Sequence, residues 1–386
     1  MIRFVAAAAV TVVLLVCALR LDDGTTSGRV AAFLVACGAG VGFVLQRSQL
    51  CFTAAFRDVF LVRGRRAALG VLAALAVGCA GYAVLFGAQL PDPSRYLPDT
   101  AHIAPASPVV LLGGVSFGIG MVLAGGCISG HLFRLGEGSL VAPLALLGCI
   151  PGYWLAFSLW NVLYLKSVST APVIWLPSWL GYAGALGLQL AVLAGLAALL
   201  FWKCREVPPT PREATDLRGA LRRIFAEPWP AWAGGAAVGV LGTFAYLWNH
   251  PLGVTAELGR VSRRAGLALS LTPSRLEGLD RLAGCRAIAS ERWITESGIF
   301  AAALVAGSLI SALLAGEFRL RKAKPRSLAL AAGGGVLLGF GAMISLGCTV
   351  GTMLSGIMAF SLHGWVFLAG LFAGAWAGTA LLRRLA

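Results

Sequence analysis

The apolar positions of this sequence form long uninterrupted runs instead of the shorter alternating or helical stripes of soluble proteins. A helix needs about 17–25 apolar residues to cross a hydrocarbon layer of about 30 Å. Ten runs are close to or within this length, and we predict that each is a transmembrane helix. They cover residues 4–19, 30–50, 67–89, 108–124, 139–165, 180–202, 231–248, 296–316, 327–346 and 361–382.

The composition supports an all-α integral membrane protein. Of the 386 residues, 58% are hydrophobic and only 12% are charged, whereas soluble globular domains carry about 25% charged residues. The excess of 31 Lys and Arg over 16 Asp and Glu would indicate nucleic acid binding in a soluble chain, but in a membrane protein it indicates basic cytoplasmic loops. The predicted partner is therefore the lipid bilayer and not nucleic acid.

Basic residues set the predicted orientation. The loops at 57–66 and 317–326 and the C-terminal pair Arg383-Arg384 concentrate Lys and Arg, as short cytoplasmic loops do. Ten spans then place both termini in the cytoplasm. The same alternation places residues 257–292 outside, although they carry seven Arg against four acidic residues. Two interpretations of this segment stay open: a solvated amphipathic surface segment, or a basic collar that concentrates an anion at the outer mouth.

An internal repeat divides the chain. Residues 114–130 and 335–351, offset by 221, share seven of seventeen positions, including a cysteine. A fainter relation aligns residues 42–53 with 242–253 at an offset of 200. The predicted organisation is an N-terminal helix in residues 1–24, a first half at 25–203, a cytoplasmic linker at 204–226 and a second half at 227–386.

The two halves are predicted to have inverted orientations. The span before the first copy of the repeat runs inward and the span before the second copy runs outward, given the loop charges. Inverted repeats are typical of membrane transporters, whose binding sites lie near the midplane where interrupted helices meet.

Three cysteine segments carry the candidate chemistry. Cys51, Cys127 and Cys348 each follow a glycine-rich apolar run and precede a segment too short to cross the membrane again. A half-helix that begins inside the bilayer directs unpaired N–H groups and the positive end of its dipole at its ligand, which favours an anion. A thiol is a soft neighbour that suits a sulfur-containing ligand. The supporting residues that we predict around the cysteines are Gly126, Ser129, Gly130, Gly347, Thr349 and Gly351.

Other polar and small residues receive simpler interpretations. His131 and His363 are expected to be local hydrogen-bonding groups, and the glycines at 114, 118, 335 and 339 are expected to pack helices closely. The nine cysteines include no CxxC pair, so no metal site and no cofactor are expected. The cysteines outside the three segments are expected to pack as small apolar residues: Cys17, Cys37, Cys79, Cys149, Cys204 and Cys285.

Residues 49–58, 113–130 and 333–364 resemble the YeeE/YedE family of bacterial inner-membrane proteins, whose characterised members take up thiosulfate. The resemblance implies an hourglass-like fold in which short interrupted or re-entrant helices reach the centre. It also implies that Cys51, Cys127 and Cys348 relay thiosulfate into the cytoplasm through S–H hydrogen bonds, without enzymatic chemistry. A small TusA-like sulfurtransferase at the cytoplasmic face is the further partner that the resemblance implies.

Two alternatives to thiosulfate import stay open at this point. The protein would then transport another sulfur or selenium species, or it would be a sulfur-transferring membrane protein that forms a persulfide on Cys127 or Cys348. Thiolates also suit Cu(I), but five methionines and the absence of paired cysteines weigh against copper.

Overall fold

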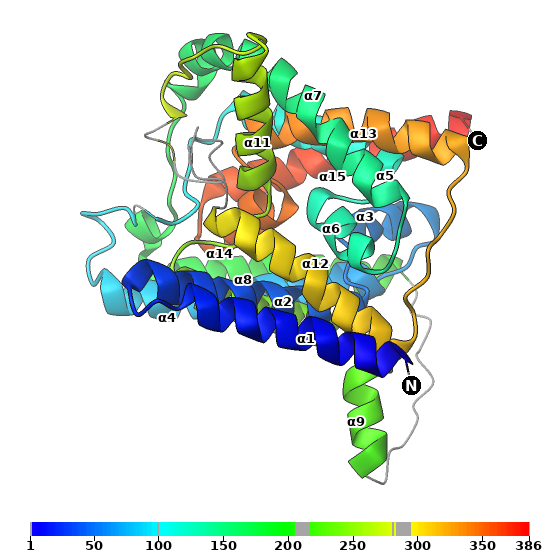
Figure 1. Ribbon diagram of the computed structural model, residues 1–386. Coiled ribbons are helices and arrows are strands. Elements are labelled where there is room, and N and C mark those ends of the chain that lie inside the picture. The colour runs from blue at the N-terminus through cyan, green and yellow to red at the C-terminus, as the bar shows by residue number, and fades with distance from the viewer. Residues whose placement is uncertain (1, 99, 205–216, 280–281, 283–294, 386) are drawn as a thin grey trace.

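The computed structural model describes residues 2–98, 100–204, 217–279, 282 and 295–385. Ten helices in these ranges are long and apolar enough to cross a membrane, as the apolar runs predict. The same ranges contain no β-strand and only two isolated bridges. Figure 1 shows both marked termini on one side of the helical bundle, at the right of the view.

The helices follow the predicted spans closely. The long ones are α1 (Ile2–Leu21), α2 (Thr26–Ser48), α4 (Arg66–Gln89), α5 (Pro108–Ala124), α7 (Val141–Leu163), α8 (Pro177–Lys203), α10 (Ala231–Trp248), α12 (Glu296–Ala315), α13 (Pro325–Ile344) and α15 (Leu362–Leu385). The short ones are α3 (Phe52–Leu61), α6 (Ile128–Gly136), α9 (Leu217–Phe225), α11 (Thr255–Ala268) and α14 (Gly356–Met358), with π-helical segments η1 (Tyr164–Val168) and η3 (Thr349–Ser355).

Helices of one half pack mainly on helices of the other. The helix α2 packs on α12 as α10 packs on α4, and α5 packs on α15 as α13 packs on α7. The short helices repeat the rule, because α6 contacts α12 as α14 contacts α4. Each contact between a helix of the first half and a helix of the second thus has a counterpart between the two equivalent helices. The two repeats therefore interleave instead of forming separate domains, while their opposite orientation in a bilayer stays a prediction.

Glycines allow the helices of the repeat to approach closely. A Cβ atom on Gly114 of α5 would lie 2.6 Å from the carbonyl oxygen of Phe367 on α15, and one on Gly335 of α13 would lie 2.3 Å from that of Ala145 on α7. The glycines four residues further on approach the same partner helices equally closely. No side chain fits at these positions, which confirms the predicted role in helix packing.

The chain is interrupted at four equivalent places. The breaks lie between α2 and α3, α5 and α6, α10 and α11, and α13 and η3. Gln49, Gly125 and Leu346 have left-handed backbones at three of them, with φ of 50°, 76° and 59°. The helix α5 thus ends at Ala124, with Gly125 as its C-cap.

Two parts of the chain differ from the sequence-based expectation. The linker contains the helix α9, which its polar composition does not predict. The helix α11 is not a solvated surface segment, because it packs on α7 and leaves Arg260 and Arg263 each only 7% exposed. Glu257 pairs with Arg260 there. Within the rest of the arginine-rich segment, residues 280–281 and 283–292 lie outside the described residues.

Candidate functional site

The three predicted cysteines stand at the N-termini of three short interrupted helices. Cys51 precedes α3, Cys127 precedes α6 and Cys348 precedes η3. Their exposed fractions are 3%, 0% and 0%. The Cys127 sulfur accepts a hydrogen bond from the Gly130 backbone at 3.4 Å, so the cysteine itself caps α6. In this position each sulfur lies where the first N–H groups of a helix are unpaired by the helix itself.

Two of the sulfurs meet at one glycine. A Cβ atom on Gly130 would lie 3.3 Å from the Cys127 sulfur and 3.9 Å from the Cys51 sulfur. The Ser129 hydroxyl lies 3.3 Å from the Cys127 sulfur. Thr349, at the start of η3, is a further neighbour of the Cys127 thiol. The Cys348 segment therefore reaches the same place as the segments of Cys51 and Cys127.

Around Cys348, a neighbouring hydroxyl group has a hydrogen-bond partner within the protein. A Cβ atom on Gly347 would lie 2.6 Å from the Thr352 hydroxyl oxygen, so a side chain does not fit there. The Thr352 hydroxyl donates to the Ser345 carbonyl at 3.0 Å. Cys149 of α7 is also close to Cys348, and its thiol donates to the carbonyl of the residue one turn earlier. Cys149 is thus buried as expected, and it lies near Cys348.

Two buried histidines stack behind this segment. The rings of His102 and His363 lie 5.6 Å apart and nearly parallel. A nitrogen of His363 lies 3.2 Å from the Ser345 carbonyl oxygen, as expected for a local hydrogen-bonding group. Burial, and then the His363 ring, lower the pKa of His102 well below its ordinary value. The His102 ring is therefore neutral at physiological pH.

Each cysteine segment also contributes a buried polar group without a hydrogen-bond partner in the structure. These groups are the hydroxyls of Thr53 and Thr349 and both ring nitrogens of His131. All three side chains are no more than 1% exposed. The His131 ring lies beside the Gly126 backbone, so its role as a local hydrogen-bonding group stays a prediction. Since buried polar groups in proteins are normally paired, these groups mark a place where a polar ligand can bind.

Arg134 is a site residue that the sequence analysis missed. Its Nη2 atom donates to the Cys51 sulfur at 3.6 Å, and its Nη1 atom donates to the Gly125 carbonyl. Arg134 follows Cys127 by seven residues, which is about two helical turns. That spacing places both residues on one face of α6 and was a signal available in the sequence.

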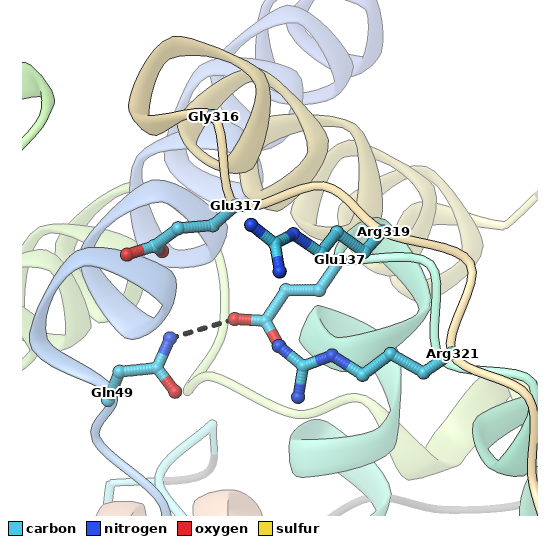
Figure 2. A pocket seen from close by; sticks show the side chains of 6 residues that line it. All are labelled: Gln49, Glu137, Gly316, Glu317, Arg319 and Arg321. Carbon is cyan, nitrogen blue, oxygen red and sulfur yellow. Dashed lines mark hydrogen bonds between the residues drawn. The ribbon is translucent and has the colours of Figure 1, made fainter.

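A cavity of about 470 Å³ is lined in part by residues close in sequence to Cys51 and Arg134 (Figure 2). Gln49, two residues before Cys51, donates to the Glu137 carboxylate at 2.8 Å. Glu137 in turn follows Arg134 by three residues on α6. The cavity is lined by Gln49, Glu137, Gly316, Glu317, Arg319 and Arg321.

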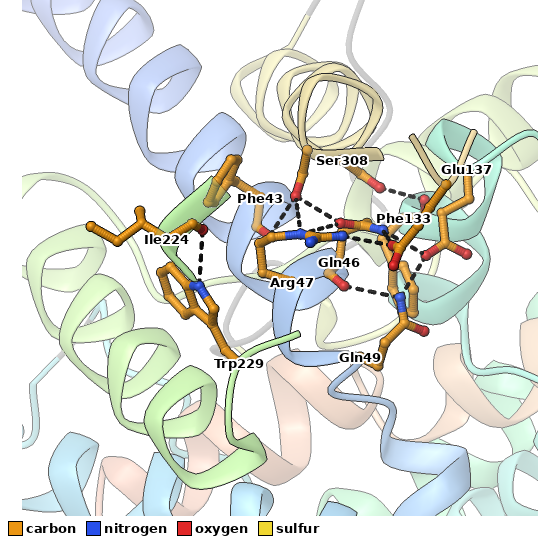
Figure 3. A network of polar contacts seen from close by, with 11 residues as sticks. Phe43, Gln46, Arg47, Gln49, Phe133, Glu137, Ile224, Trp229 and Ser308 are labelled. Carbon is orange, nitrogen blue, oxygen red and sulfur yellow. Dashed lines mark hydrogen bonds and ion pairs between the residues drawn. The ribbon is translucent and has the colours of Figure 1, made fainter. Parts of the chain in front are cut away.

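A network of polar contacts holds the helix ends at this cavity (Figure 3). Arg47 of α2 is 1% exposed and pairs with Glu317, after α12, at 2.6 Å. It also donates to Ser311 of α12 at 3.0 Å. Gln46 donates to Glu317 at 2.6 Å and to Glu137 at 3.3 Å. The network therefore ties the end of α2 to the ends of α6 and α12.

The other cysteines have varied environments. Cys17 is exposed on α1, so it does not pack inside the chain. Cys37, Cys79 and Cys204 are buried as expected, although the Cys79 thiol also donates to Gln189 at 2.9 Å. Cys285 lies outside the described residues. Within the described ranges, no group of three or more His, Cys, Asp and Glu side chains is placed to hold a metal ion.

Comparison with known proteins adds a family and named relatives. The family model described as sulphur transport matches residues 47–377. The thiosulfate transporter TsuA of Escherichia coli is 27% identical, over 90% of this chain and 93% of its own length. The protein of the same name from Spirochaeta thermophila is 28% identical, over 87% of this chain and 95% of its own length. The probable transporter YedE of Escherichia coli is 35% identical over 103 residues, which are 27% of this chain and 23% of its own length.

Proposed function

Since the chain belongs to the sulphur transport family, we propose that it carries thiosulfate through a bacterial inner membrane into the cytoplasm. The observation that carries the proposal is the meeting of Cys51, Cys127 and Thr349 at the tips of interrupted helices. Buried hydroxyl and imidazole groups that lack hydrogen-bond partners there support a polar ligand. The names of the two full-length relatives support thiosulfate as that ligand.

The proposed mechanism is a relay between neutral thiols. Apolar burial favours the protonated form of a thiol, which donates a weak S–H hydrogen bond. Weak binding at several successive sites permits conduction, whereas one strong site would retain the anion. In this proposal thiosulfate moves from Cys348 to Cys127 and Cys51 and then leaves through the cavity at Gln49. The protein forms no covalent adduct, so it is a transporter and not an enzyme.

The proposed orientation places the cavity at the cytoplasmic face. Arg319 and Arg321 line the cavity and belong to the basic loop between α12 and α13, and short basic loops stay in the cytoplasm. Both termini lie on one side of the bundle (Figure 1), which supports two cytoplasmic termini. The halves would then be inverted in the membrane. A TusA-like sulfurtransferase is the proposed acceptor of sulfur at this face.

Growth on thiosulfate tests the proposal. A cysteine-auxotrophic bacterium that lacks thiosulfate uptake would express the wild-type protein or single Cys→Ala variants at positions 51, 127 and 348. We expect each variant to reach the membrane but to abolish growth on thiosulfate as the sole sulfur source. Cys37→Ala is the matched control, because Cys37 is equally buried but contacts the Leu241 carbonyl of α10 instead.

Two outcomes would contradict the relay. Normal growth of a Cys51→Ala/Cys127→Ala double variant would show that these thiols are not needed. Mass spectrometry during turnover separates the relay from sulfur transfer, because a persulfide on Cys127 or Cys348 would show covalent chemistry.

A further inference from the structure

The region around two of the three cysteine thiols contains a permanent positive charge. The Arg134 guanidinium donates to the Cys51 sulfur at 3.6 Å and also to the Gly125 carbonyl. Arg134 appears in no ion pair between described residues. Its charge is therefore balanced neither by a carboxylate of the described chain nor by a thiol in its neutral form. An anion that reaches Cys51 meets this charge.

His131 extends the charged region toward the break before α6. A Cβ atom on Gly126 would lie 3.1 Å from the His131 Nε2 atom and 3.3 Å from the Arg134 Nη1 atom. The His131 side chain is 1% exposed, and neither of its ring nitrogens has a hydrogen-bond partner. Arg134 and His131 thus lie side by side, one turn apart on α6. Their N–H groups are near the two thiols and could donate to a ligand there.

The second copy of the repeat shows that the fold does not require this charge. At the offset of 221, Arg134 corresponds to Ser355 and His131 to Thr352. Ser355 donates to the Leu252 carbonyl at 3.2 Å, and Leu252 lies in the α10–α11 break that corresponds to the break at Cys51. The contact between the two interrupted segments of each half is therefore made by a neutral hydroxyl in the second half and by a guanidinium on sulfur in the first. A purely structural role would need only the smaller group.

We infer that Arg134 and His131 form the binding site for the oxygen atoms of the transported anion, with its terminal sulfur directed at the Cys51 and Cys127 thiols. This inference rests on the proposed function. Thiosulfate has three oxygens on its central sulfur and one terminal sulfur, so its two ends differ chemically. A guanidinium fork matches an oxyanion, and thiols match the soft terminal sulfur. Arg134 lies three residues before Glu137, which lines the cavity, so its charge would draw the anion toward that end of α6.

Uptake kinetics of purified protein in liposomes test this assignment. Wild-type protein and the Arg134→Gln, Arg134→Lys and His131→Ala variants would be compared with labelled thiosulfate. We expect Arg134→Gln to raise the KM about tenfold or more, with Vmax changed by less than about twofold, because a charged hydrogen bond is lost. Arg134→Lys should recover about half of that loss on a logarithmic scale, because the charge stays and the fork is lost. His131→Ala should raise the KM about threefold.

The matched control is Arg95→Gln. Arg95 lies in the loop after α4 and its side chain is 75% exposed, so loss of its charge should leave the KM unchanged. A wild-type protein that takes up no thiosulfate would refute the proposed function itself. If the wild type transports and Arg134→Gln keeps the wild-type KM, or lowers Vmax alone, the inference is wrong and the proposed function stands. If Arg134→Gln fails to reach the membrane, the Arg134→Lys variant is used instead. A wild-type KM for Arg134→Lys would then refute the inference, and a raised KM would support it.

Discussion

The two copies of the Gly-Cys repeat have the same frame but different side chains around their cysteines. In both copies a glycine-rich helix ends, a cysteine follows, and a short buried helix begins. The helix after Cys127 carries His131 without partners and a charged Arg134, whereas the helix after Cys348 carries hydroxyls that donate to nearby carbonyls. The repeated residues thus build the backbone frame, and the divergent residues give each cysteine different polar neighbours.

A similar contrast holds at the ends of the helices. Where α2 meets α12, a buried Arg47 pairs with Glu317 and donates to Ser311. Where the corresponding helices α10 and α4 meet, the rings of Tyr246 and Tyr82 stack 4.7 Å apart. One interface is polar and lies beside a cavity, and the other is aromatic. The two interfaces are therefore chemically unequal although the helix contacts repeat.

The largest expected effect comes from a substitution that fills the space between the Cys51 and Cys127 thiols. Gly130→Ala would place a methyl group 3.3 Å from the Cys127 sulfur and 3.9 Å from the Cys51 sulfur. The methyl group narrows the space between the two sulfurs, so we expect uptake of labelled thiosulfate to fall about tenfold, which corresponds to about 1.4 kcal/mol. The thermal unfolding midpoint should change little, because the side chains around Gly130 need to give way by only a few tenths of an ångström. Unchanged uptake would show that the anion does not pass between these sulfurs.

A second test breaks the polar interface. Glu317→Gln leaves the buried Arg47 without its carboxylate, which costs about 3–5 kcal/mol in a fully buried pair. The Glu317 side chain is 43% exposed, so solvent screening should reduce the loss of unfolding free energy to about 1–2 kcal/mol. Thermal unfolding in detergent measures it, with Asp92→Asn in an exposed pair as the control. Equal midpoints for the two variants would mean that Arg47 does not depend on Glu317.

The smallest expected effect separates the two copies most sharply. Ser355→Ala removes the hydroxyl that corresponds to Arg134 and leaves the Leu252 carbonyl without that donor. We expect a loss of about 1 kcal/mol in unfolding free energy and a change of less than about twofold in the KM for thiosulfate. If Ser355→Ala raised the KM as much as Arg134→Gln, both copies would bind the anion and the contrast between them would disappear.

The sequence predicts the spans well because membrane burial depends on local apolar length. It also predicts the short helices after Cys51, Cys127 and Cys348, since a cysteine after a glycine-rich run is visible along the chain. It does not predict that Arg47 is buried, because Glu317 and Ser311 lie more than 260 residues away. Nor does it predict the partnerless state of His131, because the absence of a partner depends on every element packed around the side chain.

The interleaving of the halves has a consequence for how the protein is made. The first half presents α2 and α4 to helices that the ribosome has not yet produced, since their packing partners are α12 and α10. At about 5–20 residues per second, translation from residue 204 to the end of α12 at Ala315 takes roughly 6 to 22 s. During that interval the glycine grooves of the early helices lie open to lipid. The incomplete chain must therefore stay in the membrane without pairing with a neighbouring copy. Its native packing is complete only when the helices of the second half have been inserted.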